Sequence, residues 1–464
     1  MEMKKINLKQ KKYISQGIGY LFISIIFLLT LIFSFFLFIE LVFFLNLQYP
    51  NLSKKSEALQ FSAQMIYDKY DRNIIQYLPE CAEYDSDLFY TLKKNSSCEF
   101  SNREFSNKYN INSIGLRDSE KSLSKPEVIF IGDSFTMGWG VNQSEIFTSI
   151  VRKKLNIKTL NAGISSYGTA RELEILKRVD TSNATHLIIQ YCLNDLSENQ
   201  SYIDNNKKII TKSKKDYENN VNKHLDRLKY YPFLYSYEHF KELYPAFNYL
   251  DNWRNERYVN RKKEHYTEAK YFLDTLNAFS ISKKTKIILF ENEFRIKNDW
   301  FLIEVNKLLS KEEYNELDII FISTKDLIDE DYYQLDTHLN LSGHKKLANK
   351  IVNAIVTEKS DTLYEISLSQ FDLNMNINNY GPTETLIGET FNLQENGTST
   401  MWLKVENLRS SAKAYIDDIP LKTITKEGLA AVEIPNKFLL EKKIFKIFLK
   451  DMNGISNTVL FEVK

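Results

Sequence analysis

The longest run of apolar residues lies near the N-terminus of the chain. It extends from Ile18 to Ile39, and after Glu40 a second apolar run covers Leu41 to Leu45. A helix of about 22 residues is roughly 30 Å long, which is the thickness of the hydrocarbon core of a bilayer. Cleavable signal sequences have a shorter apolar region, about 7–15 residues, and a small-residue cleavage site, which FFLFIELVFFLNL does not offer. We therefore predict an uncleaved transmembrane anchor over residues 18–46, rather than a signal peptide or a buried core helix.

The lysines that flank this run predict its orientation. Two follow it, Lys54 and Lys55, whereas five precede it: Lys4, Lys5, Lys9, Lys11 and Lys12. Because positive charges accumulate on the cytoplasmic side of a membrane, residues 1–17 are expected to form a cytoplasmic tail. Everything after the anchor is then expected on the other side, in a periplasmic or other extracytoplasmic compartment.

Between residues 126 and 358, short apolar strands alternate with amphipathic helices. The predicted strands are short, nearly continuous apolar runs at 128–132, 157–163, 186–193, 286–292 and 317–323. SEIFTSIVRKKL, TARELEILKRV and residues 341–356 have apolar positions at helical spacing. Buried strands joined by helices are typical of a parallel sheet with helices on both faces. We therefore predict a three-layer α/β domain.

Three further regions have different patterns. Residues 47–125 are polar and show no strong periodicity, which predicts an extracytoplasmic collar of loops and short elements. Residues 197–283 are too long for a simple crossover, and we interpret them as a helical insertion, either a roof over the sheet or an ordinary solvated excursion. Residues 360–464 alternate apolar and polar positions between NG and EG turns, which is typical of an antiparallel β-sandwich. The pattern is similar to that of immunoglobulin-like modules.

Composition adds several constraints. The formal net charge is +1, so no basic excess indicates a nucleic-acid partner. Cys81 and Cys98 lie in the region expected outside the cytoplasm, where they can form a disulfide or remain free thiols. Cys192 lies inside an apolar run and is expected to be a buried thiol. No group of cysteines, histidines and carboxylates has the spacing of a zinc site, so neither a metal nor another cofactor is expected.

The segment VIFIGDSFTMGWG places Ser134 directly after the first strand of the predicted α/β domain. Ligands of open parallel sheets bind at the carboxyl ends of the strands, so a reactive side chain is expected there. The segment is not a phosphate-binding loop, because it contains neither GxxxxGK[ST] nor GxGxxG, and it lacks the GxSxG turn of α/β-hydrolases. A serine here is by itself more typical of a helix cap, so its interpretation depends on the other strand ends.

Three later segments supply the other groups that acyl transfer needs. NAGISSYG follows the second strand and offers the backbone N–H of Gly163, and CLND follows the third strand and offers the side-chain amide of Asn194. DTHLNLSGH precedes the last helix and contains both Asp336 and His338. A hydroxyl nucleophile, a base with an orienting carboxylate and donors for an oxyanion would then meet at one edge of the sheet.

Together the four segments resemble those of the SGNH/GDSL hydrolase family, over roughly residues 105–357 and including NSIGLRD. The resemblance implies a flavodoxin-like α/β/α fold, with Ser134 as nucleophile and His338 as general base. It also implies an oxyanion hole formed by the N–H of Ser134, the N–H of Gly163 and the side chain of Asn194. Two further residues match the family pattern as supporting or structural residues: Asp195 and Asn340.

The last segment departs from the pattern of many family members. They space the final pair as D-x-x-H, whereas Asp336 and His338 here are separated by one residue. The resemblance still implies Asp336 as the carboxylate that orients His338, and Asp329 or Asp331 are the alternatives.

The sequence therefore predicts a membrane-anchored, extracytoplasmic serine esterase that works through an acyl-enzyme. Its expected substrates are O-acyl groups on envelope or surface carbohydrates, or other esters. The same site could transfer the acyl group to a sugar hydroxyl instead of water, and a non-catalytic glycan- or protein-binding module is a third interpretation. The C-terminal module offers a surface for an envelope protein or glycan partner.

Overall fold

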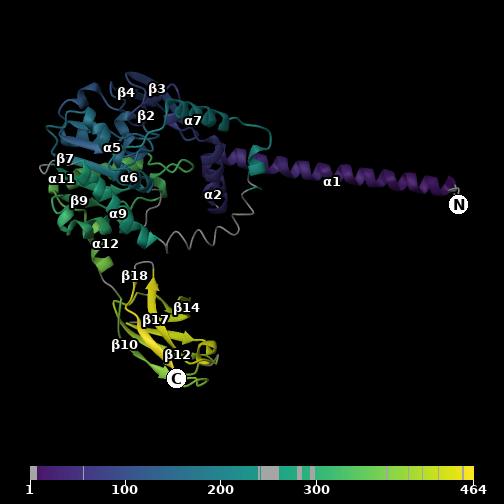
Figure 1. Cartoon of the computed structure of the whole chain (residues 1–464). Helices are drawn as coiled ribbons and strands as arrows, with labels where there is room; N and C mark the ends of the chain where they lie inside the picture. The colour runs from purple at the N-terminus through teal and green to yellow at the C-terminus, as the bar shows by residue number, and fades with distance from the viewer. Residues whose placement is uncertain are drawn as a thin grey trace. The chain divides into compact units, whose positions relative to one another are not determined.

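The computed structural model of the chain describes residues 8–55, 57–238, 241, 261–279, 285–292, 298–372, 375–394, 397–409, 411–426, 428–451 and 454–464. The chain forms two compact units (Figure 1). The first unit contains residues 1–254 and 265–361, and the second contains residues 255–264 and 362–464. Each unit has a hydrophobic core of its own.

The first unit begins with α1 (Leu8–Gln48), drawn in purple in Figure 1. The part from Gly19 to Gln48 is long and apolar enough to cross a membrane, and no residue of its most apolar window is buried in the described protein. Short elements follow α1: η1 (Pro50–Lys55), α2 (Glu57–Ile66) and the π-helical turn η2 (Tyr67–Asp71).

Five parallel strands form the sheet of the first unit, in the order β6-β5-β7-β8-β9. They are β5 (Val128–Ile131), β6 (Thr159–Asn161), β7 (His186–Tyr191), β8 (Lys286–Glu291) and β9 (Ile319–Ile322). Each strand lies within one of the predicted apolar runs, and every residue of β5, β6 and β9 is buried. The prediction of an α/β unit with a parallel sheet is therefore confirmed.

Helices cover both faces of this sheet. On one face, α4 (Phe147–Leu155) and α11 (Leu341–Thr357) share a core with Ile188 of β7. Tyr191 faces the opposite side of the strand, where its ring lies 3.8 Å from that of Phe301 in α10 (Trp300–Leu309) and 5.6 Å from that of Phe272 in α9 (Arg261–Ala278). The first unit also contains α3 (Ser134–Met137), α5 (Thr169–Ile175), α6 (Asp195–Asp204) and α7 (Lys214–Arg227).

Residues 47–125 form more regular structure than their polar sequence indicates. Two antiparallel hairpins follow η2: β1 (Ala82–Asp85) with β2 (Phe89–Leu92), and β3 (Ser96–Asn102) with β4 (Phe105–Ile111). The positions of β4 alternate between buried and exposed, and its inward side chains Phe105, Tyr109 and Ile111 pack in one cluster with Trp139. The collar and the segment that carries Ser134 therefore share a core.

The two collar cysteines are joined in a disulfide. Cys81 and Cys98 are 17 positions apart, and their Cα atoms are separated by 5.4 Å. Cys192 is only half-buried, which corrects the expectation of a buried thiol. The physical reason is that Cys192 lies just beyond the end of β7, where the chain leaves the sheet.

Part of the predicted insertion at 197–283 lies outside the described residues. The described part is helical, in α6, α7, the segment 234–238 and α9. The interpretation of this insertion as a roof over the sheet stays a prediction.

The second unit contains α12 (Thr362–Asp372) and two sheets. One has the order β10-β12-β16-β15, and the other has the order β11-β19-β17-β13-β14, with β18 beside β17. Their strands are β10 (Asn376–Gly381), β11 (Glu384–Thr385), β12 (Ser399–Glu406), β13 (Lys413–Ile416), β14 (Ile419–Pro420), β15 (Thr423–Lys426), β16 (Leu429–Ile434), β17 (Lys443–Asp451), β18 (Gly454–Ile455) and β19 (Val459–Val463). Inward side chains of both sheets, including Leu403 and Phe461, form one cluster.

Removing the disulfide is expected to destabilise the first unit. Closing a loop of this length restricts the unfolded chain and is worth about 3 kcal/mol, so the double variant Cys81→Ala/Cys98→Ala should melt at a lower temperature than the wild type. The measurement is the melting temperature of the full chain in detergent, with and without a reductant. Cys192→Ala is the matched control and should melt like the wild type. Equal melting temperatures for the double variant and the wild type would contradict the prediction.

Candidate active site

Ser134 begins α3 at the carboxyl end of β5. Asp133 caps this short helix, because its side chain accepts the N–H of Phe135 at 3.0 Å. Gly138 ends the helix with a φ of +87°, and a Cβ at this position would lie 2.5 Å from the side chain of Ile146. Both the backbone conformation and the lack of space require glycine here. The tight turn holds the hydroxyl of Ser134 at the end of the strand.

A buried arginine from the collar fixes the loop that follows α3. Arg117, in the segment NSIGLRD, donates to the carbonyl oxygens of Gly138 and Val141, the second at 2.7 Å. Its guanidinium carbon lies 3.4 Å from the centre of the Tyr109 ring, which gives a cation–π contact. Burying a cation is costly unless hydrogen bonds compensate it, and here both terminal nitrogens of Arg117 donate to these carbonyls, so the guanidinium and the loop hold one another in place.

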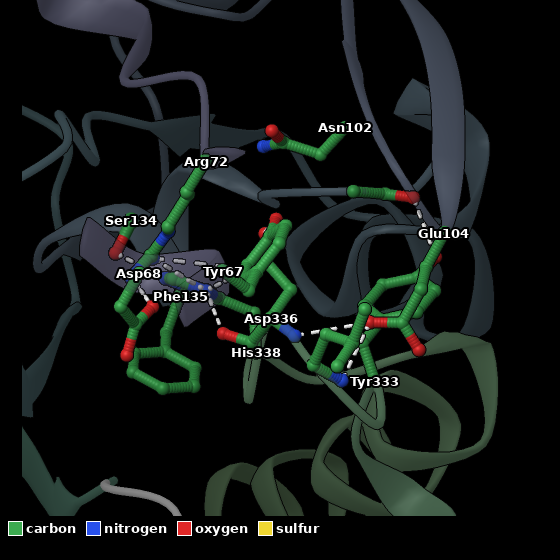
Figure 2. A network of polar contacts seen from close by, with 12 residues as sticks. Tyr67, Asp68, Arg72, Asn102, Glu104, Ser134, Phe135, Tyr333, Asp336 and His338 are labelled. Atoms are coloured by element: carbon green, nitrogen blue, oxygen red, sulfur yellow. Dashed lines mark hydrogen bonds and ion pairs between the residues drawn. The ribbon is translucent and has the colours of Figure 1, made fainter. Parts of the chain in front are cut away.

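Ser134, His338 and Asp336 form a continuous line of hydrogen bonds (Figure 2). Oγ of Ser134 lies 2.7 Å from Nε2 of His338, and Nδ1 of His338 lies 2.6 Å from Oδ1 of Asp336. The carboxylate can only accept, so the ring proton is assigned to Nδ1 and Nε2 is left to accept the proton of the serine hydroxyl. A nucleophile, a base and an orienting carboxylate are thus in hydrogen-bonding reach of one another.

Two aromatic side chains fix the imidazole ring of His338. Trp139 stacks on it, with ring centres 4.8 Å apart and planes within 14°. Phe135 lies 4.7 Å away at 35°. Both belong to the segment that carries Ser134, so one turn positions the nucleophile and the ring of its base together.

The carboxylate of Asp336 receives hydrogen bonds and charge from the collar. The hydroxyl of Tyr67 donates to its second oxygen, Oδ2, and Nη2 of Arg72 lies 3.7 Å from Oδ1. Burial alone raises the pKa of Asp336, but the charge of Arg72 and the hydrogen bonds from His338 and Tyr67 lower this pKa to about 2. The carboxylate is therefore ionised under all ordinary conditions.

Arg72 also lies close to the base itself. Its Nη2 is 3.2 Å from Nδ1 of His338, and its Nη1 is 3.1 Å from Asp68 (Figure 2). Its guanidinium carbon is 5.1 Å from the centre of the Trp139 ring. The approach to Nδ1 is not a hydrogen bond when that nitrogen carries a proton, because both groups are then donors. Arg72 therefore acts on His338 through its charge and through Asp336.

The π-helical turn η2 brings Tyr67 and Arg72 to the same carboxylate. The N–H of Arg72 donates to the carbonyl oxygen of Tyr67, five residues earlier, at 2.8 Å. In an α-helix, side chains five positions apart point about 140° away from each other. The wider π turn reduces this divergence, and such turns are frequent at functional sites.

A third collar residue fixes the backbone next to Asp336. The carboxylate of Glu104 accepts three consecutive N–H groups, from Gln334 at 2.7 Å, Leu335 at 2.8 Å and Asp336 at 3.0 Å. The loop that carries the acid is therefore held from the collar at both its backbone and its side chain.

The three expected oxyanion donors lie in different environments. Among the described residues, no acceptor contacts the backbone N–H of Ser134. Asn194 is exposed, and its side chain makes no capping bond to α6. The N–H of Gly163, in contrast, donates to Oδ1 of Asn161 at 3.0 Å. A Cβ on Gly163 would lie 2.4 Å from the backbone nitrogen of Met137, so this glycine permits the close packing of α3, and its N–H already has an acceptor.

The alternative carboxylates have other partners or positions. Asp331 forms an ion pair with Lys346 at 2.6 Å, and Asp329 is exposed. Asn340 caps α11, because its side chain accepts the N–H of Ser342 and of the next residue. The side chain of Asp195 accepts the hydroxyl proton of a threonine in α5 at 2.8 Å.

The contribution of the collar was not predicted. Tyr67, Arg72 and Glu104 lie more than 200 positions before Asp336 in the chain, in a region without a motif. Trp139 could have been inferred, since it stands in GDSFTMGWG only five positions after the serine. Among the described residues, no group of three or more histidine, cysteine or carboxylate side chains is arranged to hold a metal ion.

Comparisons with known proteins give distant similarities. No family model and no curated protein matches the sequence. Among solved structures, a carbohydrate esterase whose active site has catalytic and non-catalytic binding functions is 15% identical over 50% of this chain and 65% of its own, with a TM-score of 0.30. An acetyl xylan esterase from the rumen bacterium Butyrivibrio proteoclasticus is 12% identical over 51% of this chain and 64% of its own, with a TM-score of 0.30.

A gut microbial diltiazem-metabolizing enzyme is 11% identical over 69% of this chain and 65% of its own, with a TM-score of 0.23. The chain thus spans less than two thirds of the length of each of these three structures. Similarity at this level carries no argument about function, which rests on the geometry of the site.

The low pKa of Asp336 makes its contribution to stability depend on pH. Its pKa is 3.8 without the fold and about 2 within it, so the ionised carboxylate contributes about 2 kcal/mol, present above about pH 4 and lost as the pH falls through about 2. The difference in melting temperature between wild type and Asp336→Asn should therefore shrink over this range. Asp226→Asn, which changes an exposed carboxylate, is the control. A difference that stays constant down to pH 2 would refute the assignment.

Proposed function

We propose that the chain is a membrane-anchored serine esterase of the SGNH type. One observation carries this proposal: Oγ of Ser134 lies 2.7 Å from Nε2 of His338, whose other nitrogen is bound to the carboxylate of Asp336. A serine that only caps a helix has no need of an oriented base. The proposal is supported by the position of Ser134 directly after β5, at the carboxyl edge of a parallel sheet, where such sheets bind ligands.

The geometry supports a two-step acyl-enzyme mechanism. Oγ of Ser134 attacks the carbonyl carbon of the ester while its proton passes to Nε2 of His338. The tetrahedral intermediate then collapses, and His338 returns the proton to the departing alcohol oxygen. Water repeats the sequence on the acyl-enzyme and releases the acid. Asp336 stays ionised throughout, and it stabilises the imidazolium and keeps its ring in position.

The negative charge of each intermediate requires hydrogen-bond donors on the carbonyl oxygen. We assign this role to the backbone N–H of Ser134 and the side-chain amide of Asn194. The resemblance implies the N–H of Gly163 as a third donor, and this N–H would have to exchange Asn161 for the substrate. Two donors suffice for a working oxyanion hole.

The cellular setting follows from α1. If α1 crosses the membrane with residues 1–17 in the cytoplasm, the hydrolase faces the periplasm or another extracytoplasmic space. O-acyl groups on envelope or surface carbohydrates are one class of ester in such a space, and we propose them as the substrates. The second unit, with its two sheets around one core, is proposed to be an immunoglobulin-like β-sandwich that contacts a glycan or protein of the envelope.

Ser134→Ala is the direct test of the nucleophile. We expect hydrolysis of a small acyl ester to fall by at least about 1,000-fold, since the base then has no hydroxyl to activate. A fluorophosphonate probe should label the wild type but not the variant. Ser310→Ala, which changes an exposed serine after α10, should retain both activity and labelling. Full activity of Ser134→Ala would reject the esterase, and a wild type that the probe does not label would favour a binding module.

Asn194→Ala tests the oxyanion donor. Removal of one such donor lowers kcat by about 100- to 1,000-fold, with little change in KM, because the amide acts on the intermediate rather than on the bound ester. Steady-state kinetics on the same ester measure both constants. Gln200→Ala, which changes another exposed amide on α6, should leave both unchanged. An equal loss in both variants would remove Asn194 from the mechanism.

A further inference from the structure

Glu40 places a carboxylate inside the apolar half of α1. Its side chain is buried, and it accepts the N–H of Ser236 at 2.7 Å, the hydroxyl of Ser236 at 2.8 Å and the hydroxyl of Tyr230 at 2.8 Å. A carboxylate on a membrane helix is costly unless protein groups satisfy it. These donors all come from the insertion, so the segment around residues 230–238 is fixed against α1.

Further contacts extend this attachment along the helix. The hydroxyl of Ser236 donates to the carbonyl oxygen of Phe36 at 2.9 Å. The rings of Phe33 and Phe233 lie 5.5 Å apart in an edge-to-face arrangement. The insertion segment thus lies beside α1 from residue 33 to residue 40, within the part of the helix that is apolar enough to cross a membrane.

A groove runs between α1 and this segment. It has a volume of about 910 Å³, and α1 lines it with Leu29, Ile32, Phe33 and Phe36, which lie on one face of the helix by their spacing. Phe233 and Tyr237 form the opposite wall. The volume is that of a small-molecule site, but such sites carry several polar groups that fix a soluble ligand, and this lining is almost entirely apolar.

The surroundings of the groove indicate what fills it. The apolar side chains of α1 on either side are exposed in the described protein, so the same medium that covers them continues into the groove. Tyr230, which donates to Glu40, and its neighbour Tyr231 are exposed, and tyrosine is enriched at the level of lipid headgroups. Lys241, at the rim, pairs with Glu238 at 3.6 Å. A lysine can lay its alkyl chain on an apolar wall while its ammonium group stays in a polar region.

We propose that this groove binds the acyl chain of a bilayer phospholipid. The inference rests on the proposed insertion of α1 into a membrane. It has a consequence for the active site, because Leu234 and Tyr235 of the same segment pack in one cluster with Tyr67 and Leu335, the neighbour of Asp336. The insertion segment that lines the groove therefore packs against the loop that carries Asp336. Because the groove lies on the membrane helix, the ester is hydrolysed close to the membrane surface.

Tryptophan fluorescence in brominated lipid tests the occupant of the groove. The full chain is reconstituted in phosphatidylcholine vesicles with or without bromine on the acyl chains, and the wild-type emission is subtracted. Tyr237→Trp is the groove probe, and Phe233→Trp is a second probe in case the first perturbs folding. Phe22→Trp reports whether α1 is inserted, and Ile210→Trp, an exposed position in the insertion outside the groove, is the unquenched control.

Acyl chains in the groove should reduce the added emission of Tyr237→Trp and Phe233→Trp at least about twofold, as for Phe22→Trp, and leave Ile210→Trp unchanged. Quenching of Phe22→Trp alone would overturn the proposal, because acyl chains would then be excluded from the groove although α1 is inserted. No quenching of Phe22→Trp would overturn it together with the membrane anchor. The readout does not involve ester hydrolysis, so it gives the same result in Ser134→Ala and is independent of the proposed reaction.

Discussion

The first unit depends on the burial of one negative charge, the carboxylate of Asp336. A carboxylate out of contact with water is stable only if donors and positive charge surround it. Here the donors are His338 and Tyr67, and the charge is that of Arg72. Because two of these three residues come from the collar, the collar is as much a part of the site as the sheet is. Glu104 adds to this contribution, because its carboxylate accepts the backbone N–H groups of the loop that carries Asp336.

Glu40 meets the same constraint at a second place. It too is a buried carboxylate, and it too takes its donors from a segment about 190 positions away in the chain, at Tyr230 and Ser236. The two acids fix different parts of the unit: Asp336 joins the collar to the sheet, and Glu40 joins the insertion to α1. The apolar cluster that contains Phe43, Tyr67, Leu234 and Leu335 lies between them. Segments that are far apart in the sequence of this unit are therefore held together by a few hydrogen-bonded buried carboxylates and the side chains packed around them.

The sequence predicts the strands well, for a physical reason. A strand buried on both faces must be apolar throughout, so VIFI and IIFI mark β5 and β9 without any reference to their neighbours. Ser134, His338 and Asp336 follow from short motifs. Tyr67, Arg72 and Glu104 cannot be found in this way, because their role depends on which distant segment lies beside them and not on local spacing. Gly163 shows a second limit of prediction from motifs. Its motif indicates a backbone N–H that is free to approach a substrate, but in the structure this N–H donates to Asn161.

The π-helical turn η2 makes the number of residues between Tyr67 and Arg72 important for the site. The carbonyl of Tyr67 and the N–H of Arg72 close a ring that contains one residue more than an α-helical turn. A relative with an ordinary α-helix here would need a spacing of four residues, about 40° around the axis, to bring the same two side chains together. Winding the present residues as an α-helix would instead leave the guanidinium and the phenol about 140° apart. Neither side chain would have changed, yet the acid would lose one of its two collar partners. A comparison of this protein with a distant relative should therefore count the residues in this turn as well as identify them.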